Sequence, residues 1–222
     1  MIANPHPDSA VAPDRTPGRT DVLTRALAVV TLVGVAVITV ICITVQFLRT
    51  DLDWIATAMS LYVIGPYGTW VQAAFFAPAP GIAALGIGWY RALDRHAHNI
   101  APLALFVIAA AALCITAAFV TDKGEHPVTV HGQIHEWAAF GTFVCVTTAM
   151  LVQSVRLHLD RHWRGRFPGA LTLAIITAIY FWIYALAKPI PRGLGEKVVI
   201  GLVLLWLWRA AWWLVRDGRR PA

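Results

Sequence analysis

The stretch Ala26–Leu48, ALAVVTLVGVAVITVICITVQFL, contains no charged residue from end to end. A helix of about 20 residues crosses a bilayer core about 30 Å thick, so this stretch predicts a transmembrane helix. It is too long for the apolar region of a signal peptide, and no small-residue cleavage site follows it. The whole chain has the same character, because 58% of its 222 residues are hydrophobic and only 14% are charged. Soluble domains carry about 25% charged residues, so the composition indicates a membrane protein.

Further apolar runs of similar length follow, and they predict helices because the strands of a membrane barrel would be about 10 residues long and strictly alternating. We therefore expect an all-α, polytopic membrane protein with six transmembrane helices in one domain. The expected spans are residues 26–48, 69–93, 100–120, 134–157, 168–187 and 198–215. They form a membrane domain over residues 22–216, between a polar, disordered tail at residues 1–21 and a short tail at residues 217–222.

The connection between the first two spans, Asp51–Gly68, is apolar but contains a Gly-Pro-Tyr-Gly turn. We expect a short interfacial or re-entrant helix here, capped by Asp53. In the second span, Pro78 and Pro80 predict a kink. Three glycines close by, at positions 81, 86 and 88, predict close packing against another helix.

The orientation follows from the basic residues. With both termini on one side of the membrane, thirteen of the 18 lysines and arginines lie on that side or in its tails, and five lie on the other. The positive-inside rule then predicts a multi-pass protein of the cell membrane with cytoplasmic N- and C-termini. The same distribution accounts for the net charge of +6 without a nucleic-acid partner, and the partner we expect is the lipid bilayer.

The densest polar stretch is Thr121–Trp137, TDKGEHPVTVHGQIHEW, which this orientation puts on the outer side. His131 and His135 are four residues apart, so they share one face of a helix. If that helix begins at Val130, the face continues through Thr142, Cys145, Ala149 and Gln153. We expect this semi-polar stripe to face the interior of the bundle.

Two histidines at this spacing are half of a metal site, and we consider a zinc ion held by His131 and His135. His126 or Asp122 would supply a third ligand and water a fourth, and the metal would lower the pKa of that water. Ser60 or Glu136 would then orient the substrate or transfer a proton. The alternative is that these residues are interfacial polar groups that solvate a loop.

Several short motifs resemble the membrane family known as domain of unknown function 998. They are Arg49-Thr-Asp-Leu-Asp53, Met59-Ser-Leu-Tyr62, Gly65-Pro-Tyr-Gly68, the histidine at position 135, and Gly193-Leu-Gly-Glu-Lys197, where the resemblance would favour arginine at the last position. The likeness covers about Arg25–Val215. It implies six membrane helices without an assigned activity, and it draws attention to Ser60, Tyr62, Gly65, Gly68, His135 and Glu196.

The function we expect first is the binding of a lipid or small ligand in an outward-facing polar pocket that includes Ser60, Tyr62, His135 and Glu196. One alternative is a metal-dependent intramembrane hydrolase acting on lipid, since Ser60, Asp122, His131 and His135 are similar in kind to the zinc sites of alkaline ceramidases and adiponectin-receptor-like hydrolases. Another is a small transporter gated at Pro78–Pro80. The three cysteines resemble buried hydrophobic residues, and a Cys42–Cys114 disulfide stays an open possibility.

Overall fold

The computed structural model describes residues 22–123, 129–186 and 190–217, and in these ranges the chain is helical without a strand. Six helices there are long and apolar enough to cross a membrane, and α2 and α3 together form the second of them. This confirms the all-α, six-span architecture. The elements are α1 (Val22–Leu48), η1 (Met59–Val63), α2 (Gly68–Phe76), α3 (Pro78–Ala92), α4 (Ile100–Ala118), α5 (Val130–Leu159), η2 (Arg164–Arg166), α6 (Phe167–Leu186) and α7 (Arg192–Asp217).

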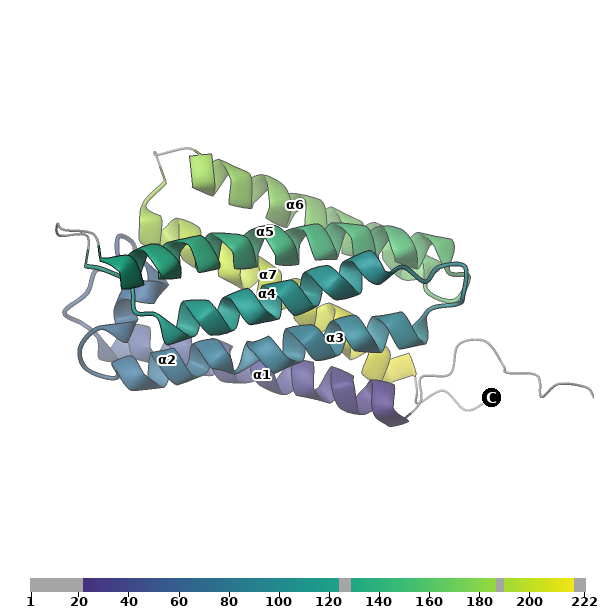
Figure 1. Ribbon diagram of the computed structural model, residues 1–222, viewed down its shortest axis with the longest axis horizontal. Coiled ribbons are helices and arrows are strands. Elements are labelled where there is room, and N and C mark those ends of the chain that lie inside the picture. The colour runs from purple at the N-terminus through teal and green to yellow at the C-terminus, as the bar shows by residue number, and fades with distance from the viewer. Residues whose placement is uncertain (1–21, 124–128, 187–189, 218–222) are drawn as a thin grey trace, which may run out of the picture.

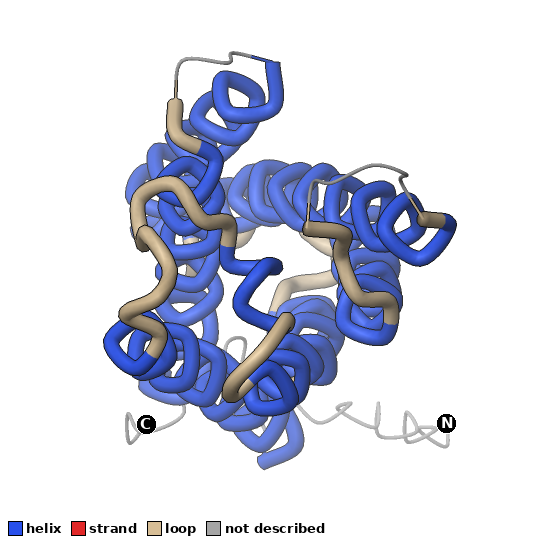
Figure 2. Tube along the Cα trace, turned by 90° about the vertical axis from the view of Figure 1, so that its left-hand side faces the viewer, coloured by secondary structure: helices blue, strands red, loops and turns tan. Residues whose placement is uncertain are grey.

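The long helices lie side by side along the long axis of the molecule (Figure 1). Helix α1 packs against α3 and α7, α4 packs between α3 and α5, and α6 packs on α5 and α7. Helix α1 begins and α7 ends at the same end of the bundle, which we call the terminal end. The opposite end carries η1, which lies across the centre of the ring of helices (Figure 2), and we call it the η1 end.

The proline-rich part of the second span is a packing feature, as the glycines near it predicted. Helix α2 ends at Phe76 and α3 begins at Pro78, because proline cannot continue the hydrogen-bond ladder. One turn later, a Cβ on Gly81 would lie 2.9 Å from the Cα of Thr31 in α1. The Thr31 hydroxyl donates to the Gly81 carbonyl at 2.8 Å. Helices α1 and α3 therefore touch backbone to backbone.

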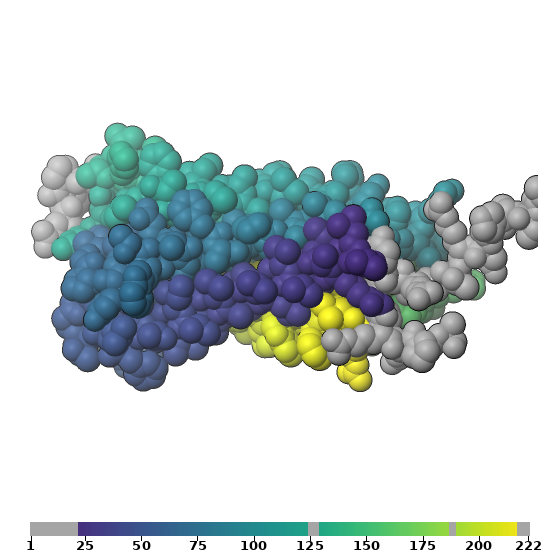
Figure 3. All heavy atoms as spheres, turned by 90° about the horizontal axis from the view of Figure 1, so that it is seen from below, coloured from purple at the N-terminus to yellow at the C-terminus, as the bar shows by residue number. Residues whose placement is uncertain are grey.

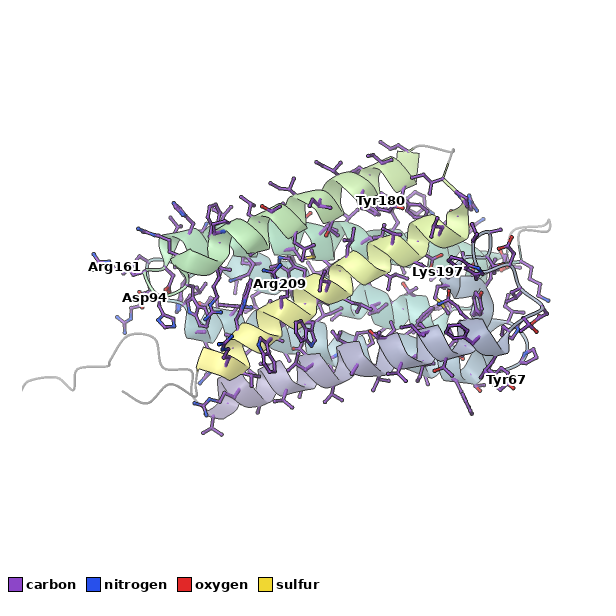
Figure 4. The ribbon with its side chains drawn as sticks, turned by 180° about the vertical axis from the view of Figure 1, so that it is seen from behind. Tyr67, Asp94, Arg161, Tyr180, Lys197 and Arg209 are labelled. Atoms are coloured by element: carbon purple, nitrogen blue, oxygen red, sulfur yellow. The ribbon has the colours of Figure 1, made fainter. Side chains whose placement is uncertain are left out.

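At the terminal end, one carboxylate holds two loops together. Asp160 is 1% exposed and accepts hydrogen bonds from the backbone N–H groups of Asp94 at 2.8 Å, His162 at 2.9 Å and Trp163 at 3.2 Å. These bonds join the α3–α4 connection to the α5–α6 connection. In Figure 4, Asp94 and Arg161 mark this end, whereas Lys197 and Tyr67 mark the η1 end.

Three helices begin at least four residues earlier than the apolar runs predicted: α1 at Val22, α5 at Val130 and α7 at Arg192. The earlier start of α5 brings His131 into the same helix as His135. The cysteines at positions 42, 114 and 145 are all free. Of the predicted tails, residues 1–21 and 217–222, Asp217 is the last residue of α7, and the others lie outside the described residues.

Candidate functional site

The guanidinium of Arg49 organises the connection that follows α1. Arg49 is 5% exposed, and its Nε and Nη2 donate to the two carboxylate oxygens of Asp51 at 2.8 and 2.9 Å. Its Nη1 donates to the carbonyls of Ile64 at 2.9 Å and Pro66 at 3.2 Å. This pairing raises the pKa of Arg49 and lowers the pKa of Asp51. Between the two carbonyls, Gly65 has a φ of 93°, a conformation that glycine adopts without strain.

The next part of this connection, residues 53–58, is fastened to the start of α7. Asp53 accepts the N–H of Ile55 at 2.7 Å and so closes a turn. Backbone N–H groups in the first turn of α7 and the ammonium of Lys197 donate hydrogen bonds to backbone carbonyls of this segment. Since the first N–H groups of a helix have no partner within it, this contact satisfies both segments. The pairs are Gly193 N with Ala56 O at 3.1 Å, Leu194 N with Ile55 O at 2.8 Å, and Lys197 Nζ with Trp54 O at 2.6 Å and Thr57 O at 2.8 Å.

Glu196, the fifth residue of α7, binds the beginning of η1. The backbone N–H groups of Met59 and Ser60 donate to its carboxylate. A carboxylate is favourable at this position, because the N–H groups at a helix start carry partial positive charge. Tyr62, also in η1, is fully buried, and the Lys197 ammonium lies 5.2 Å from the centroid of its ring. Burial raises the pKa of the Tyr62 hydroxyl.

His135 connects α5 to the end of α4. It is 5% exposed, and its Nδ1 lies 2.9 Å from the carbonyl oxygen of Thr116 and 2.7 Å from that of Phe119. Because carbonyls only accept hydrogen bonds, Nδ1 carries the proton. The last carbonyls of a helix lack hydrogen-bond partners within it, and His135 supplies a donor to two carbonyls at this end of α4. In the part of the chain that the structure describes, Nε2 has no hydrogen-bond partner, and it is the ring nitrogen left for another group.

These elements line a cavity of about 90 Å³ between the helices of the bundle. Its apolar lining comes from α1, α2, α3, α4, α5 and α7. Three of the four residues predicted to bind a ligand line this one cavity, whereas Tyr62 lies outside its lining. The polar residues of the lining are Ser60, Thr116, His135, Thr142 and Glu196.

Most of the α5 stripe that the sequence predicted faces the interior, but His131 at its start is exposed. Thr142, Ala149 and Gln153 are 7%, 0% and 2% exposed, as expected for residues that share a face with His135. Cys145 is only partly buried, at the edge of the stripe. The side chains of His135, Thr142 and Gln153 are therefore turned toward the other helices and away from lipid.

Three of the four candidate metal ligands, Asp122, His131 and His135, lie in the described ranges. Asp122 accepts the N–H and the hydroxyl of Thr129 at 2.8 and 2.7 Å, which lowers its pKa and caps the start of α5. His131 is exposed with its ring 5.2 Å from that of Phe119, whereas His135 is buried against α4. No group of three metal-binding side chains occurs in the described ranges, and His126 lies outside them, so the zinc site stays a prediction. Glu136, the other catalytic candidate, is exposed and lies outside the cavity lining that contains Ser60.

Two residues at this end had no structural role in the sequence analysis. Arg49 and Lys197 stand at the ends of apolar spans, where basic residues are usual and carry little information. The signal that distinguishes Arg49 is its spacing to Asp51, just before a Gly-Pro turn whose carbonyls need a donor. Nothing in the local sequence pairs Lys197 with residues 54 and 57.

Comparison with known proteins gives one family match. A family model described as "Protein of unknown function (DUF998)" matches residues 23–213, which covers most of the chain. No curated protein and no solved structure matches it.

Proposed function

We propose a function from the residues themselves, because the chain belongs to the family described as "Protein of unknown function (DUF998)" and that description names no activity. The protein binds a small ligand in its central cavity. The ligand places a hydrogen-bonding head group at the η1 end, among Ser60, His135 and Glu196, and an apolar body against the aliphatic lining.

The observation that carries this proposal is the convergence of Ser60, His135 and Glu196, from η1, α5 and α7, on one cavity whose other lining residues are apolar except for two threonines. Polar groups inside a membrane bundle are costly, so they are retained where they bind something or each other. Part of each group is already used, since His135 binds α4 through Nδ1 and Glu196 receives two N–H groups of η1. This fixes the side chains in position and leaves Nε2 and the remaining lone pairs of the carboxylate for a ligand. An apolar cavity with a few fixed polar groups is the usual form of a small-molecule site.

The volume of the cavity limits the size of the ligand. Sites for drug-sized ligands measure about 300–1,000 Å³, and this cavity is about 90 Å³. It takes a molecule of a few heavy atoms, or the end of a longer chain, but not a whole phospholipid. A lipid ligand would therefore enter the cavity with one end only.

We assign the η1 end to the outer side of the membrane, with the terminal end in the cytoplasm. The support is the distribution of the described basic side chains near the span ends, which are the residues that the positive-inside rule counts. Those at the terminal end are Arg25, Arg91, Arg95, Arg156, Arg161, Arg164, Arg166 and Arg216, and those at the η1 end are Arg49, Lys123, Arg192 and Lys197.

The test compares two matched variants of α5. Thr142 and Thr148 each donate a hydroxyl to the carbonyl four residues earlier, at 2.9 and 2.7 Å, but Thr142 lines the cavity and Thr148 is exposed on the outer face of the helix. Thr142→Phe fills the cavity, whereas Thr148→Phe adds the same ring outside it. Mass spectrometry of purified protein should detect a co-purifying small molecule, near one per chain, in the wild type and in Thr148→Phe but not in Thr142→Phe. Equal occupancy in the two variants, or an empty wild type that binds none of the small molecules extracted from the same membranes, would refute the proposal.

A further inference from the structure

At the η1 end the cavity is bordered by η1, whose Ser60 is part of the lining. The connection after α1 crosses the bundle centre at this end (Figure 2). It is hydrogen-bonded to α7 through the pairs described above for Gly193, Leu194 and Lys197, and Glu196 holds the start of η1. A route from the outside water would have to break these bonds together.

The side of the bundle is less firmly closed. A groove of about 390 Å³ lies between α1 and α7, lined on one side by Val35, Ile38, Thr39, Cys42, Ile43 and Gln46, and on the other by residues of α7. Helix α1 runs along the surface here (Figure 3), and α7 diverges from it toward Lys197 (Figure 4). The groove rim includes Ile43, Leu205 and Trp208, which are 51%, 46% and 44% exposed. In a membrane, such apolar exposed side chains face lipid chains.

The groove and the central cavity are neighbours that share part of their lining. Ile38, Ile200 and Leu204 line both. The partition between lipid and cavity therefore consists of aliphatic side chains of α1 and α7, which can change rotamer without breaking a hydrogen bond.

We propose that the ligand of the central cavity enters sideways from the bilayer, through the α1–α7 groove, past Ile38, Ile200 and Leu204. This inference rests on the proposed function and names its ligand class. The ligand is a lipid-soluble molecule, such as a medium-chain alcohol or fatty acid, with one hydrogen-bonding head group and an apolar body that dissolves in the hydrocarbon layer. Water-soluble ions and metabolites are excluded from the site.

A position in the groove allows the route to be blocked without a clash. Gly201 lines the groove but not the cavity, and a Cβ there would meet nothing within 4 Å. Gly201→Phe therefore fills the groove. Gly141 in α5 also has open space at its Cβ and lines neither volume, so Gly141→Phe is the matched control.

The experiment measures access to the cavity independently of ligand identity. Cys42, Cys114 and Cys145 are replaced by alanine, and Thr116→Cys provides a thiol in the cavity lining of α4. The protein in lipid vesicles is then exposed to N-ethylmaleimide, which dissolves in the bilayer, or to a charged methanethiosulfonate, which stays in water. A second reporter, Thr142→Cys, is used if Thr116→Cys lowers the yield of folded protein.

We expect N-ethylmaleimide to label the cavity thiol and the charged reagent to label it at least tenfold more slowly. Gly201→Phe should slow labelling by N-ethylmaleimide at least tenfold, and Gly141→Phe should leave the rate unchanged. Labelling at the same rate with Gly201→Phe, labelling by the charged reagent as fast as by N-ethylmaleimide, or no labelling by either reagent would overturn the lateral route. The proposed function itself fails on a different result, equal ligand occupancy in Thr142→Phe and Thr148→Phe.

Discussion

Replacing Arg49 by lysine tests whether the guanidinium holds the connection after α1 in place. Arginine offers five N–H donors in a planar fork, and here three of its nitrogens reach Asp51 and the carbonyls of Ile64 and Pro66. Lysine keeps the charge but has a single nitrogen. It can reach Asp51 or the carbonyls, but not all of them together.

The expected loss of stability in Arg49→Lys follows from the hydrogen bonds to the two carbonyls. The contact with Asp51 is left out of the sum, because the Asp51 side chain is 60% exposed and exposed ion pairs contribute little. The single ammonium of lysine reaches one of the two carbonyls, so the other loses its charged donor at a partly buried bond, and a hydrogen bond to a charged group contributes about 1.5–3 kcal/mol. For a protein of this size, 1 kcal/mol shifts the melting temperature by about 2–4 °C, so Arg49→Lys should lower it by about 3–12 °C.

The assay is thermal unfolding of the detergent-purified protein, followed by the fluorescence of its 10 tryptophans. The control is Arg192→Lys, because Arg192 is exposed and surface substitutions usually change stability by less than about 0.5 kcal/mol. If Arg49→Lys unfolds at the wild-type temperature while its folded yield is normal, the guanidinium does not hold this connection in the way described.

Two further predictions concern the other connection at the η1 end. Thr129→Ala removes the hydroxyl that donates to Asp122 and accepts the Gly132 N–H at 3.0 Å. This variant should lower the free energy of unfolding by about 0.5–2 kcal/mol, measured by thermal unfolding, whereas Thr129→Ser should have the stability of the wild type. The folded pKa of Asp122 lies below its usual 3.8, so the bonds from Thr129 to this carboxylate stabilise the protein above that pH, and their contribution is lost as the pH falls below it. Asp122→Asn should therefore lose less stability than the wild type on acidification. An unchanged dependence of the melting temperature on pH would contradict this. For the orientation, Lys123→Cys in intact cells should react with an impermeant thiol reagent and Arg164→Cys should not, and the reverse pattern would invert the assignment.

Several properties of this protein could be predicted from local sequence. The number of spans follows from the length of uncharged runs, since crossing a bilayer needs a fixed number of helical residues. The interior face of α5 follows from the spacing of His135, Thr142 and Gln153, since positions three, four and seven apart share a side of a helix. The packing of α1 on α3 was signalled by the glycines around Gly81.

The partners of the polar residues were decided by the tertiary structure. Glu196 caps η1, more than a hundred residues earlier in the chain, and His135 binds carbonyls at the end of α4. His131 and His135 are four residues apart in α5, yet the side chain of His131 is exposed and that of His135 is buried. The zinc site that they would share stays a prediction. A residue pattern gives the direction of a side chain relative to its own helix. Which donor or acceptor it meets depends on how the helices pack against one another.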